Sequence, residues 1–407
     1  MTLVSKNIVV GVSGGIAAYK ACHLVRLFTE QGHRVHVVPT PTALKFVGAA
    51  TFEALSGNPV STSVFDAVDE VRHVNLGQQA DLVVIAPATA DLLARLVIGR
   101  ADDLLTATCL VATCPIVLAP AMHTEMWHHA ATRANVETLR SRGIAVLEPA
   151  HGRLTGKDTG PGRLPEPEQI AAMAQVLLAG QKLSRTLEGL RVVISAGGTQ
   201  EDLDPVRYLG NRSSGRQGFA LAEVAVQRGA EVTIVAGATD NLPTPPGARI
   251  IRVGSAVQMQ EAIEEASADA DIVVMAAAVA DMRPKNPASV KLKKGVDSDA
   301  LSSLELVENP DILAGLVADR RPGQTIVGFA AETGDTERSA LEHAKVKLQR
   351  KGCDVLMCNE VGNGKVFGQA TNMGWILTRN GEVFEVGAGS KFEVAAQIWD
   401  AIEAVHG

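Results

Sequence analysis

The sequence alternates short apolar runs with helical patterns, and it begins this alternation twice, each time with a glycine-rich turn. The first start is VVGVSGGIAAYKA near the N-terminus, and the second is VVISAGGTQEDLDPVRYLGNRSSGRQG near residue 190. Free backbone N–H groups and the helix dipole at such turns favour a phosphate or another anion. Neither segment has the spacing G-x-x-x-x-G-K-[ST], and the second is not G-x-G-x-x-G. We therefore expect two nucleotide-type pockets of a less common kind, and two reactions.

The alternation in the first half predicts a parallel, doubly wound sheet, which is a flavodoxin-like or Rossmann-like layer. The apolar β-type runs lie at 7–12, 34–38, 82–86, 115–119 and 144–147, and the helical patterns at about 16–31, 90–99, 128–142 and 168–179. The Gly- and Pro-rich stretch 149–167 is too long for an ordinary connection, so we expect a lid or binding loop there.

The second half predicts another three-layer α/β domain. Its apolar runs lie at 191–196, 232–236, 249–253, 271–276, 326–330 and 354–358, and its helical patterns at 216–228, 256–267 and 336–351, followed by a hairpin at Asn380-Gly381 and a helix near 391–405. The segment 283–308 is predicted to leave the sheet toward a ligand or partner, with a solvated loop as the alternative. Polar residues and glycine at 180–189 indicate a linker, so we predict domains at 1–182 and 187–407.

Composition favours a globular protein without an affinity for polyanions. The 407 residues carry a net charge of −7, which gives no general reason to bind nucleic acid or an anionic membrane. The N-terminus lacks an apolar signal region, and no stretch reaches the ~20 apolar residues of a spanning helix, so we expect a cytoplasmic protein. The five cysteines form no C-x-x-C pair, which argues against a zinc site and a disulfide framework and favours buried thiols.

Four motifs of the first half are candidates for one site. They are SGGIAAYK at 13–20, His73 in RHVNLG, PATAD at 87–91 and PAMHTEMW at 120–127. PATAD and PAMHTEMW directly follow apolar runs, which places them at the carboxyl ends of strands, where open α/β sheets bind ligands. His73 alone is more often a structural imidazole than a functional one.

Together the four motifs resemble the flavin-dependent cysteine decarboxylases, which combine a histidine with P-A-S/T-A-N/D, P-x-M-N-x-x-M-W and a lid bearing L-A-C-G. The resemblance implies that His73 is the catalytic base. It also implies that FMN oxidises a cysteinyl thiol to a thioaldehyde, so that the carboxylate can leave. The residues implied to bind FMN are Ser13, Gly14, Pro87, Ala88 and Thr89, and those implied to bind substrate are Ala121, Met122 and His123.

Two positions depart from that family's pattern. His123 replaces the family asparagine, so an imidazole would recognise the substrate carboxylate. In the lid LTGKDTGPGR, Gly156 stands where the family has its cysteine proton donor, and Asp158 stands opposite the family aspartate. The final reduction therefore requires another donor, such as solvent or a neighbouring side chain.

The second half contains SAGGTQEDLDPVRYLGNRSSGRQG, AAAVADMRP, KLKK, NPDIL, GFAAET and KVKLQRK in this order. Together they resemble the bacterial phosphopantothenate–cysteine ligases. The resemblance implies an acyl-cytidylate made from CTP, with Mg²⁺ bridging the phosphates and Asn211 holding the intermediate while cysteine attacks. Such a reaction needs cations, which Lys291, Lys347 and Lys351 could supply. The other residues implied to bind CTP are Ala277, Asp281, Pro310, Asp311, Ile312, Leu313 and Phe329; the metal ligands stay unknown.

The whole chain thus resembles the bifunctional phosphopantothenoylcysteine decarboxylase/phosphopantothenate–cysteine ligases of bacterial coenzyme A synthesis. The implied substrates are 4′-phosphopantothenate, cysteine and CTP. The family also implies trimers of the first domain and dimers of the second, which close into a dodecamer. Two alternatives stay open: a ligase whose first domain binds flavin as a scaffold or regulator without decarboxylating, and a tandem dinucleotide oxidoreductase.

Overall fold

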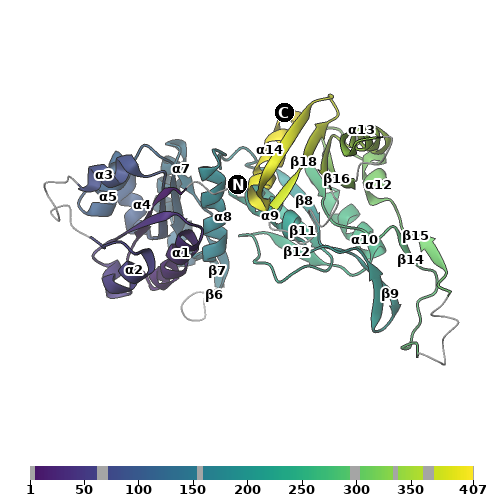
Figure 1. Ribbon diagram of the computed structural model, residues 1–407, viewed down its shortest axis with the longest axis horizontal. Coiled ribbons are helices and arrows are strands. Elements are labelled where there is room, and N and C mark those ends of the chain that lie inside the picture. Colours follow the sequence, from purple (N-terminus) through teal and green to yellow (C-terminus); the bar gives the residue numbers. More distant parts are fainter. Residues whose placement is uncertain are drawn as a thin grey trace. The chain divides into compact units, whose positions relative to one another are not determined.

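The computed structural model describes residues 5–61, 72–153, 159–293, 303–332, 338–360 and 371–406. The chain divides into two compact units, Met1–Ser184 and Arg185–Gly407, each with its own sheet (Figure 1). This junction lies within the linker that the sequence predicts at 180–189. Among the described helices, none combines the length and the apolar character that crossing a membrane requires.

The first unit is built on a parallel sheet with strand order β2-β1-β3-β4-β5. This is the flavodoxin-like order, and it confirms the predicted fold class. Each predicted apolar run forms one of these strands, because strands covered on both faces are apolar throughout. The strands are β1 (Asn7–Val12), β2 (Arg34–Pro39), β3 (Leu82–Ala88), β4 (Ile116–Pro120) and β5 (Ala145–Val146).

Helices surround this sheet, and a hairpin follows its last strand. The four predicted helical patterns correspond to α1 (Tyr19–Glu30, preceded by the 3-10 turn Ile16–Ala18), α4 (Ala90–Val97), α7 (Ala130–Ser141) and α8 (Pro167–Leu178). The structure adds the 3-10 turn Ala43–Lys45, α2 (Ala49–Ser56), α3 (Arg72–Gln79), α5 (Leu104–Val111) and α6 (Thr124–His128). The predicted lid begins and ends as the antiparallel pair β6 (Ala150–Arg153) and β7 (Thr159–Arg163). Gly156 and Asp158 lie outside the described residues.

The second unit has an eight-stranded sheet in the order β12-β11-β8-β13-β16-β17-β18-β19. The first six strands are parallel in the Rossmann-like order, and the last two are antiparallel. The predicted hairpin at Asn380-Gly381 is confirmed, with Gly381 at φ +89°. The strands are β8 (Arg191–Ala196), β11 (Glu231–Ala236), β12 (Arg249–Arg252), β13 (Ile272–Met275), β16 (Thr325–Glu332), β17 (Val355–Glu360), β18 (Thr371–Thr378) and β19 (Val383–Ser390).

The described helices of this unit are α9 (Arg216–Gln227), α10 (Ala256–Ser267), α12 (Ile312–Ala318), α13 (Ala340–Lys351) and α14 (Lys391–His406). Two small antiparallel ribbons leave the sheet: β9 (Gln200–Asp204) with β10 (Arg207–Gly210), and β14 (Met282–Pro284) with β15 (Leu306–Glu308). The second ribbon shows that the two ends of the segment 283–308 lie outside the eight-stranded sheet and pair with each other. Of the five cysteines, Cys109, Cys353 and Cys358 are buried.

Candidate active sites

A buried hydroxyl connects two loops at the carboxyl edge of the first sheet. Ser13, which follows β1, donates from Oγ to the carbonyl oxygen of Pro87 at 2.7 Å and accepts from the Thr89 amide at 3.0 Å. Its side chain is almost fully buried, and Thr89 caps α4 by accepting from the Leu92 amide. Ser13, Pro87, Ala88 and Thr89 are therefore brought together as the sequence predicts. The Ser13 hydroxyl, however, already makes contacts within the protein.

The turn after Ser13 provides unpaired backbone donors. The N–H groups of Gly14 and Gly15 donate to no acceptor in the part of the chain that the structure describes. Glycine is needed at position 14, because a Cβ there would lie 2.5 Å from Cβ of Thr42. Thr42 follows β2, so the loops after β1, β2 and β3 meet at this turn. Such free donors before a helix suit a phosphate group.

The loop after β4 carries the three predicted substrate-binding residues and supports the β6–β7 hairpin. The Ala121 amide donates to the Ala88 carbonyl at 3.1 Å, which joins this loop to the one after β3. The Met122 amide donates to the Gly162 carbonyl at 2.9 Å, and a Cβ at Gly162 would lie only 2.2 Å from the Met122 oxygen. His123 is exposed at the start of α6. The hairpin is therefore fixed against the predicted substrate loop through a position that only glycine fits.

His73 lies in the first turn of α3, a helix that the sequence patterns did not predict. Its ring is half-buried, and its Nδ1 atom is buried without a hydrogen-bond partner among the described residues. Helix α3 packs closely on α5, because a Cβ at Gly77 would lie 2.8 Å from the Thr108 carbonyl oxygen. A buried ring nitrogen without a partner among the described residues is an unusual arrangement, and it leaves Nδ1 of His73 available for a hydrogen bond to a ligand.

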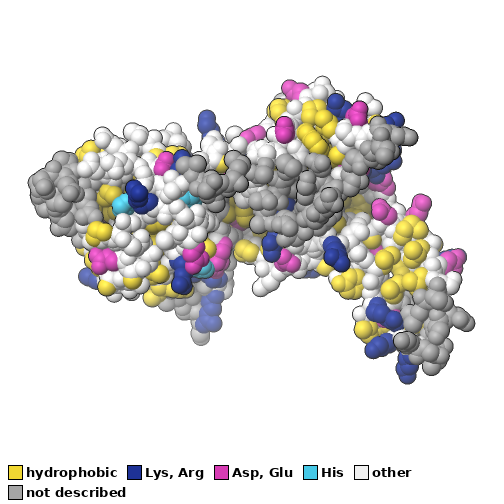
Figure 2. All heavy atoms as spheres, viewed as in Figure 1, with side chains coloured by type: hydrophobic (Ala, Val, Ile, Leu, Met, Phe, Trp, Pro, Cys, Tyr) yellow, Lys and Arg dark blue, Asp and Glu magenta, His cyan; other side chains and the backbone are white. Residues whose placement is uncertain are grey.

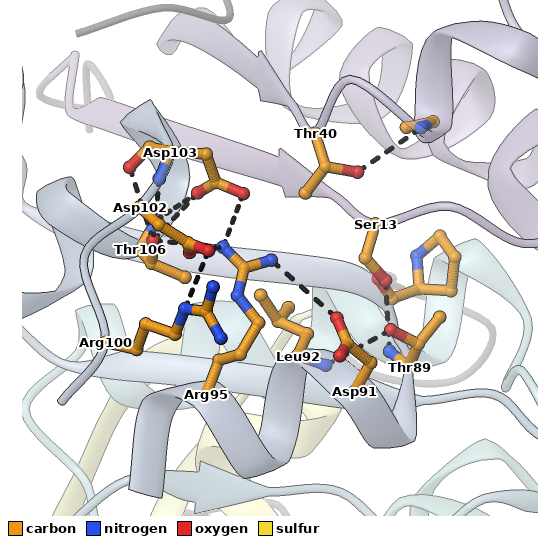
Figure 3. A network of polar contacts seen from close by, with 12 residues as sticks. Ser13, Thr40, Thr89, Asp91, Leu92, Arg95, Arg100, Asp102, Asp103 and Thr106 are labelled. Carbon is orange, nitrogen blue, oxygen red and sulfur yellow. Dashed lines mark hydrogen bonds and ion pairs between the residues drawn. The ribbon is translucent and has the colours of Figure 1, made fainter. Parts of the chain in front are cut away.

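An arginine connects α4 to the start of α5. Arg95 donates to Asp102 at 2.5 Å and to Asp103 at 2.6 Å, and Asp103 caps α5 by accepting from the Thr106 amide. Figure 3 shows this network on α4, the helix that Thr89 caps, beside the Ser13 contact. Because α5 supports α3, Arg95 joins the PATAD motif to the helix that carries His73. The sequence reasoning missed Arg95, which lies four residues after PATAD and reads as a surface charge.

The second unit repeats the hydroxyl connection with different residues. Ser195 at the end of β8 accepts from the Ala277 amide at 3.0 Å, and Thr199 accepts from the Ala280 amide at 2.9 Å. Between them, Gly197 has φ +80°, and a Cβ there would lie 2.4 Å from the Ala238 oxygen. The predicted glycine-rich turn is therefore packed against the loops after β11 and β13. Ala277, a predicted CTP residue, lies directly at this turn.

Asn211 and Asp281 are both exposed near that turn. Asn211 donates from Nδ2 to the Val279 carbonyl at 3.0 Å, which places it beside the loop after β13. The Asp281 carbonyl accepts from the Asn309 amide at 2.8 Å, so the start of NPDIL is joined to the same loop. Ile312 is 5% exposed and belongs to the core, whereas Leu313 is only partly buried. The side chain of Ile312 is therefore structural, and its backbone is the part left for a ligand.

Two of the predicted phosphate-binding lysines already hold carboxylates. Lys347 and Lys351 lie one turn apart on α13, as the sequence predicts. Lys347 contacts Glu332 at the end of β16 at 2.7 Å, and Lys351 contacts Asp311, which caps α12. Burial opposes ionisation of Asp311, but the hydrogen bond from Lys351 holds its pKa below the ordinary value. Phe329 lies half-buried on β16, three residues before Glu332.

Lys291, the third predicted lysine, belongs to a segment with different contacts. It is exposed, and its neighbour Leu292 is bonded to the β9–β10 ribbon rather than to α13. The described residues contain no group of three or more His, Cys, Asp or Glu side chains that could hold a metal ion. The sequence reasoning also missed Thr42, Glu332 and the hydroxyls of Ser195 and Thr199, since their partners are distant in the sequence.

Comparisons with known proteins assign each unit to a protein family. A family described as flavoprotein matches residues 1–178, and the C-terminal domain of DNA/pantothenate metabolism flavoproteins matches residues 187–405. The coenzyme A biosynthesis bifunctional protein CoaBC of Mycolicibacterium smegmatis is 58% identical over 98% of this chain and 97% of its own length. The chain belongs to the CoaBC family. The CoaBC protein of Haemophilus influenzae is 42% identical over 99% of this chain and 98% of its own length.

A crystal structure of the C-terminal domain of a CoaBC protein is also similar, with 37% identity over 54% of this chain and 97% of that one, and a TM-score of 0.45. As a CoaBC family member, the chain is a bifunctional enzyme of coenzyme A biosynthesis, with a flavoprotein decarboxylase domain followed by a ligase domain.

Proposed function

We propose that residues 1–182 decarboxylate 4′-phosphopantothenoylcysteine with FMN, and that residues 187–407 make this compound from 4′-phosphopantothenate, cysteine and CTP. The observation that carries the proposal is that each unit has its own glycine-rich turn, joined by a hydroxyl to the neighbouring loop. In the ligase reaction CTP is split to CMP and pyrophosphate as the amide forms. In the decarboxylase reaction the carboxylate of the cysteinyl group leaves as carbon dioxide.

The first turn fits FMN. The free N–H groups of Gly14 and Gly15 suit its phosphate, and Pro87, Ala88 and Thr89 form the neighbouring wall. When bound, FMN accepts two electrons from the cysteinyl thiol group and later returns them. His73 then has the role of base, because its Nδ1 is buried and has no partner in the described chain. Ala121, Met122 and His123 would hold the substrate, with the imidazole of His123 facing its carboxylate.

The decarboxylase half also needs a proton donor in place of the family cysteine. Cys22 and Cys114 are partly exposed elsewhere in this unit. Burial raises the pKa of both thiols. We propose solvent or a side chain near the β6–β7 hairpin as the donor, since Gly156 cannot supply a proton.

The second turn is proposed to hold CTP and its Mg²⁺. Lys347 and Lys351 would exchange Glu332 and Asp311 for phosphate oxygens, and Lys291 would add a third cation. Ala277, Asp281, Phe329 and the backbone from Pro310 to Leu313 would surround the nucleotide. Asn211 would hold the acyl-cytidylate through its carboxamide while the cysteine amine attacks.

The assembly is a further part of the proposal. Large apolar side chains are exposed around the two ribbons of the second unit, and Figure 2 shows hydrophobic side chains gathered where Figure 1 places β14 and β15. Such patches mark interfaces between subunits. We propose that this face forms the dimer, and that trimers of the first unit complete a dodecamer. The exposed residues are Val206, Tyr208, Leu209, Val290, Leu304 and Leu306.

Three measurements test the proposed function. The visible spectrum of the purified protein should show bound flavin, and native mass spectrometry should give the mass of twelve chains. Incubation with CTP, Mg²⁺, 4′-phosphopantothenate and cysteine should yield pyrophosphate, carbon dioxide and 4′-phosphopantetheine. Parallel reactions with ATP, GTP and UTP test the choice of nucleotide.

The same assay separates the alternatives. Bound flavin with accumulation of 4′-phosphopantothenoylcysteine would favour the regulatory first domain, and accumulation of the oxidised enethiol product would exclude a substitute proton donor. Membership of the CoaBC family does not support the oxidoreductase alternative.

A further inference from the structure

The carboxylate of Asp204 accepts several hydrogen bonds, and this residue has no role in the proposed function. Its side chain is fully buried at the end of β9. Oδ1 accepts from the amides of Val206 at 2.8 Å and Arg207 at 2.9 Å, which closes the turn between β9 and β10. Oδ2 accepts from Nε of Arg207 at 3.0 Å and from its Nη2. The Arg207 hydrogen bonds hold the pKa of Asp204 far below the ordinary carboxyl value, so the group stays charged.

The same carboxylate reaches a segment more than eighty residues away. The Leu292 amide donates to Oδ2 of Asp204 at 3.1 Å, and the Leu292 carbonyl accepts from Nη2 of Arg207 at 2.9 Å. The Asp204–Arg207 pair therefore holds both polar groups of one peptide residue. We name residues 285–292 the strap. Two backbone bonds also hold the strap, from the Ala288 amide to the Leu203 carbonyl at 2.9 Å and from the Lys285 amide to the Glu305 carbonyl at 2.9 Å, and the Lys285 side chain pairs with Glu305 at 2.5 Å.

Lys291 immediately precedes the residue that is held at both its amide and its carbonyl. Its own side chain is exposed and makes no hydrogen bond or ion pair with the residues that the structure describes. A lysine side chain on a free loop loses much conformational entropy on binding a phosphate, and a fixed backbone reduces that loss. The charge-assisted bonds of the pair are of the stronger kind, so they suit this purpose.

We propose that Asp204 is a positioning residue of the ligase reaction, which fixes the strap and thereby presents Lys291 to the triphosphate of CTP. Asp204 does not contact the nucleotide in this arrangement; it acts through Leu292. The inference rests on the proposed role of Lys291 in CTP binding. Arg207 completes the pair, and its side chain is 39% exposed, so the carboxylate is the member that is shielded from solvent.

The test is a double-mutant cycle between Asp204→Asn and Lys291→Ala in the full-length protein. Kinetic constants are measured separately for CTP and for cysteine, and carbon dioxide release from supplied 4′-phosphopantothenoylcysteine reports on the first unit. The matched control is Asp202→Asn, which makes the same chemical change at an exposed position on the same strand.

We expect Asp204→Asn to lower kcat/KM for CTP by about tenfold, to leave KM for cysteine and carbon dioxide release unchanged, and to add nothing to the loss caused by Lys291→Ala. Asp202→Asn should behave as the unmutated enzyme. If the two substitutions act independently, the fold-loss in kcat/KM for CTP of the double variant will equal the product of the two single losses. That result would show a general structural role of Asp204 and overturn the proposal. Unchanged kinetics in Asp204→Asn, beside a clear loss in Lys291→Ala, would also overturn it.

Two further results keep the inference separate from folding and from the CTP assignment. Hydrogen exchange on the unmutated protein should show slow exchange of the Leu292 amide, and free exchange there would overturn the proposal even if Asp204→Asn does not fold. Normal use of CTP by Lys291→Ala would instead remove the proposed function of Lys291, and with it this inference.

Discussion

The two units arrange their first turn in the same way but surround it with different chemistry. In each, a hydroxyl at the end of the first strand bonds to the loop after a neighbouring strand: Ser13 to Pro87 and Thr89, Ser195 to Ala277. The site residues of the first unit are glycine amides, a loop that holds a hairpin, and a half-buried histidine on α3. Those of the second unit include lysines that are already paired with carboxylates.

This difference fits the charge of the ligand that we propose for each site. A flavin needs one anion site and a base, which neutral amides and an imidazole supply. A triphosphate needs several cations, and unpaired lysines side by side would repel each other in the free protein. Pairing Lys347 with Glu332 and Lys351 with Asp311 removes that repulsion, and in the proposed function the nucleotide would replace the carboxylates. The same α/β plan thus serves two chemistries through the residues at its edge.

The largest expected effect is the loss of one reaction while the reaction of the other unit is kept. His73→Asn should lower carbon dioxide release by about 10²- to 10⁴-fold, because a positioned base is lost, while amide formation stays unchanged. Both rates are measured on one preparation, so ligation serves as the internal control. Carbon dioxide release near the unmutated rate would remove His73 from the mechanism.

The corresponding change in the second unit is Asn211→Asp. It puts a carboxylate beside an anionic intermediate and removes the donor to the Val279 carbonyl, so amide formation should fall by about 10²-fold. The mutant is incubated with CTP, Mg²⁺ and phosphopantothenate, cysteine is then added, and pyrophosphate and product are followed separately. An unchanged circular dichroism spectrum and thermal midpoint would assign the loss to chemistry. Normal product formation would show that Asn211 has no essential role.

A smaller effect tests whether the hairpin depends on its contact with the substrate loop. Gly162→Ala should destabilise the first unit by about 1–3 kcal/mol from the backbone strain at φ +138°, and further because the new Cβ meets the Met122 oxygen. Gly152→Ala is the matched control, since its φ is +152° but its nearest contact is 3.7 Å away. Calorimetry measures both. Equal losses in the two variants would contradict the close approach.

The smallest effect compares the two hydroxyl connections directly. Ser13→Ala and Ser195→Ala each remove a fully or almost fully buried hydroxyl together with its hydrogen bonds, which costs about 1–3 kcal/mol. We expect the loss to be larger for Ser13→Ala, because Ser13 both donates and accepts at this contact. Thermal unfolding of each variant checks the order, and a larger loss in Ser195→Ala would reverse the comparison.

The sequence predicted the strands of both sheets well, because buried parallel strands are continuous apolar runs. It did not predict α3, whose residues RHVNLGQQ are largely polar, or the β9–β10 ribbon, whose residues are charged and interrupted by Pro205. At the sites, the glycine-rich turns were visible as local patterns. The contacts of Gly14 with Thr42 and of Lys347 with Glu332 were not, because they depend on which strands become neighbours.

The strands of each sheet also come from one continuous part of the chain. The described strands of the first sheet end at Val146, and those of the second begin at Arg191. During synthesis, the ribosome can therefore release a complete first sheet before any strand of the second has been made. Apolar strands of the two sheets are then never exposed together, which limits mispairing between them. The order of the two domains along the gene thus also sets an order of folding.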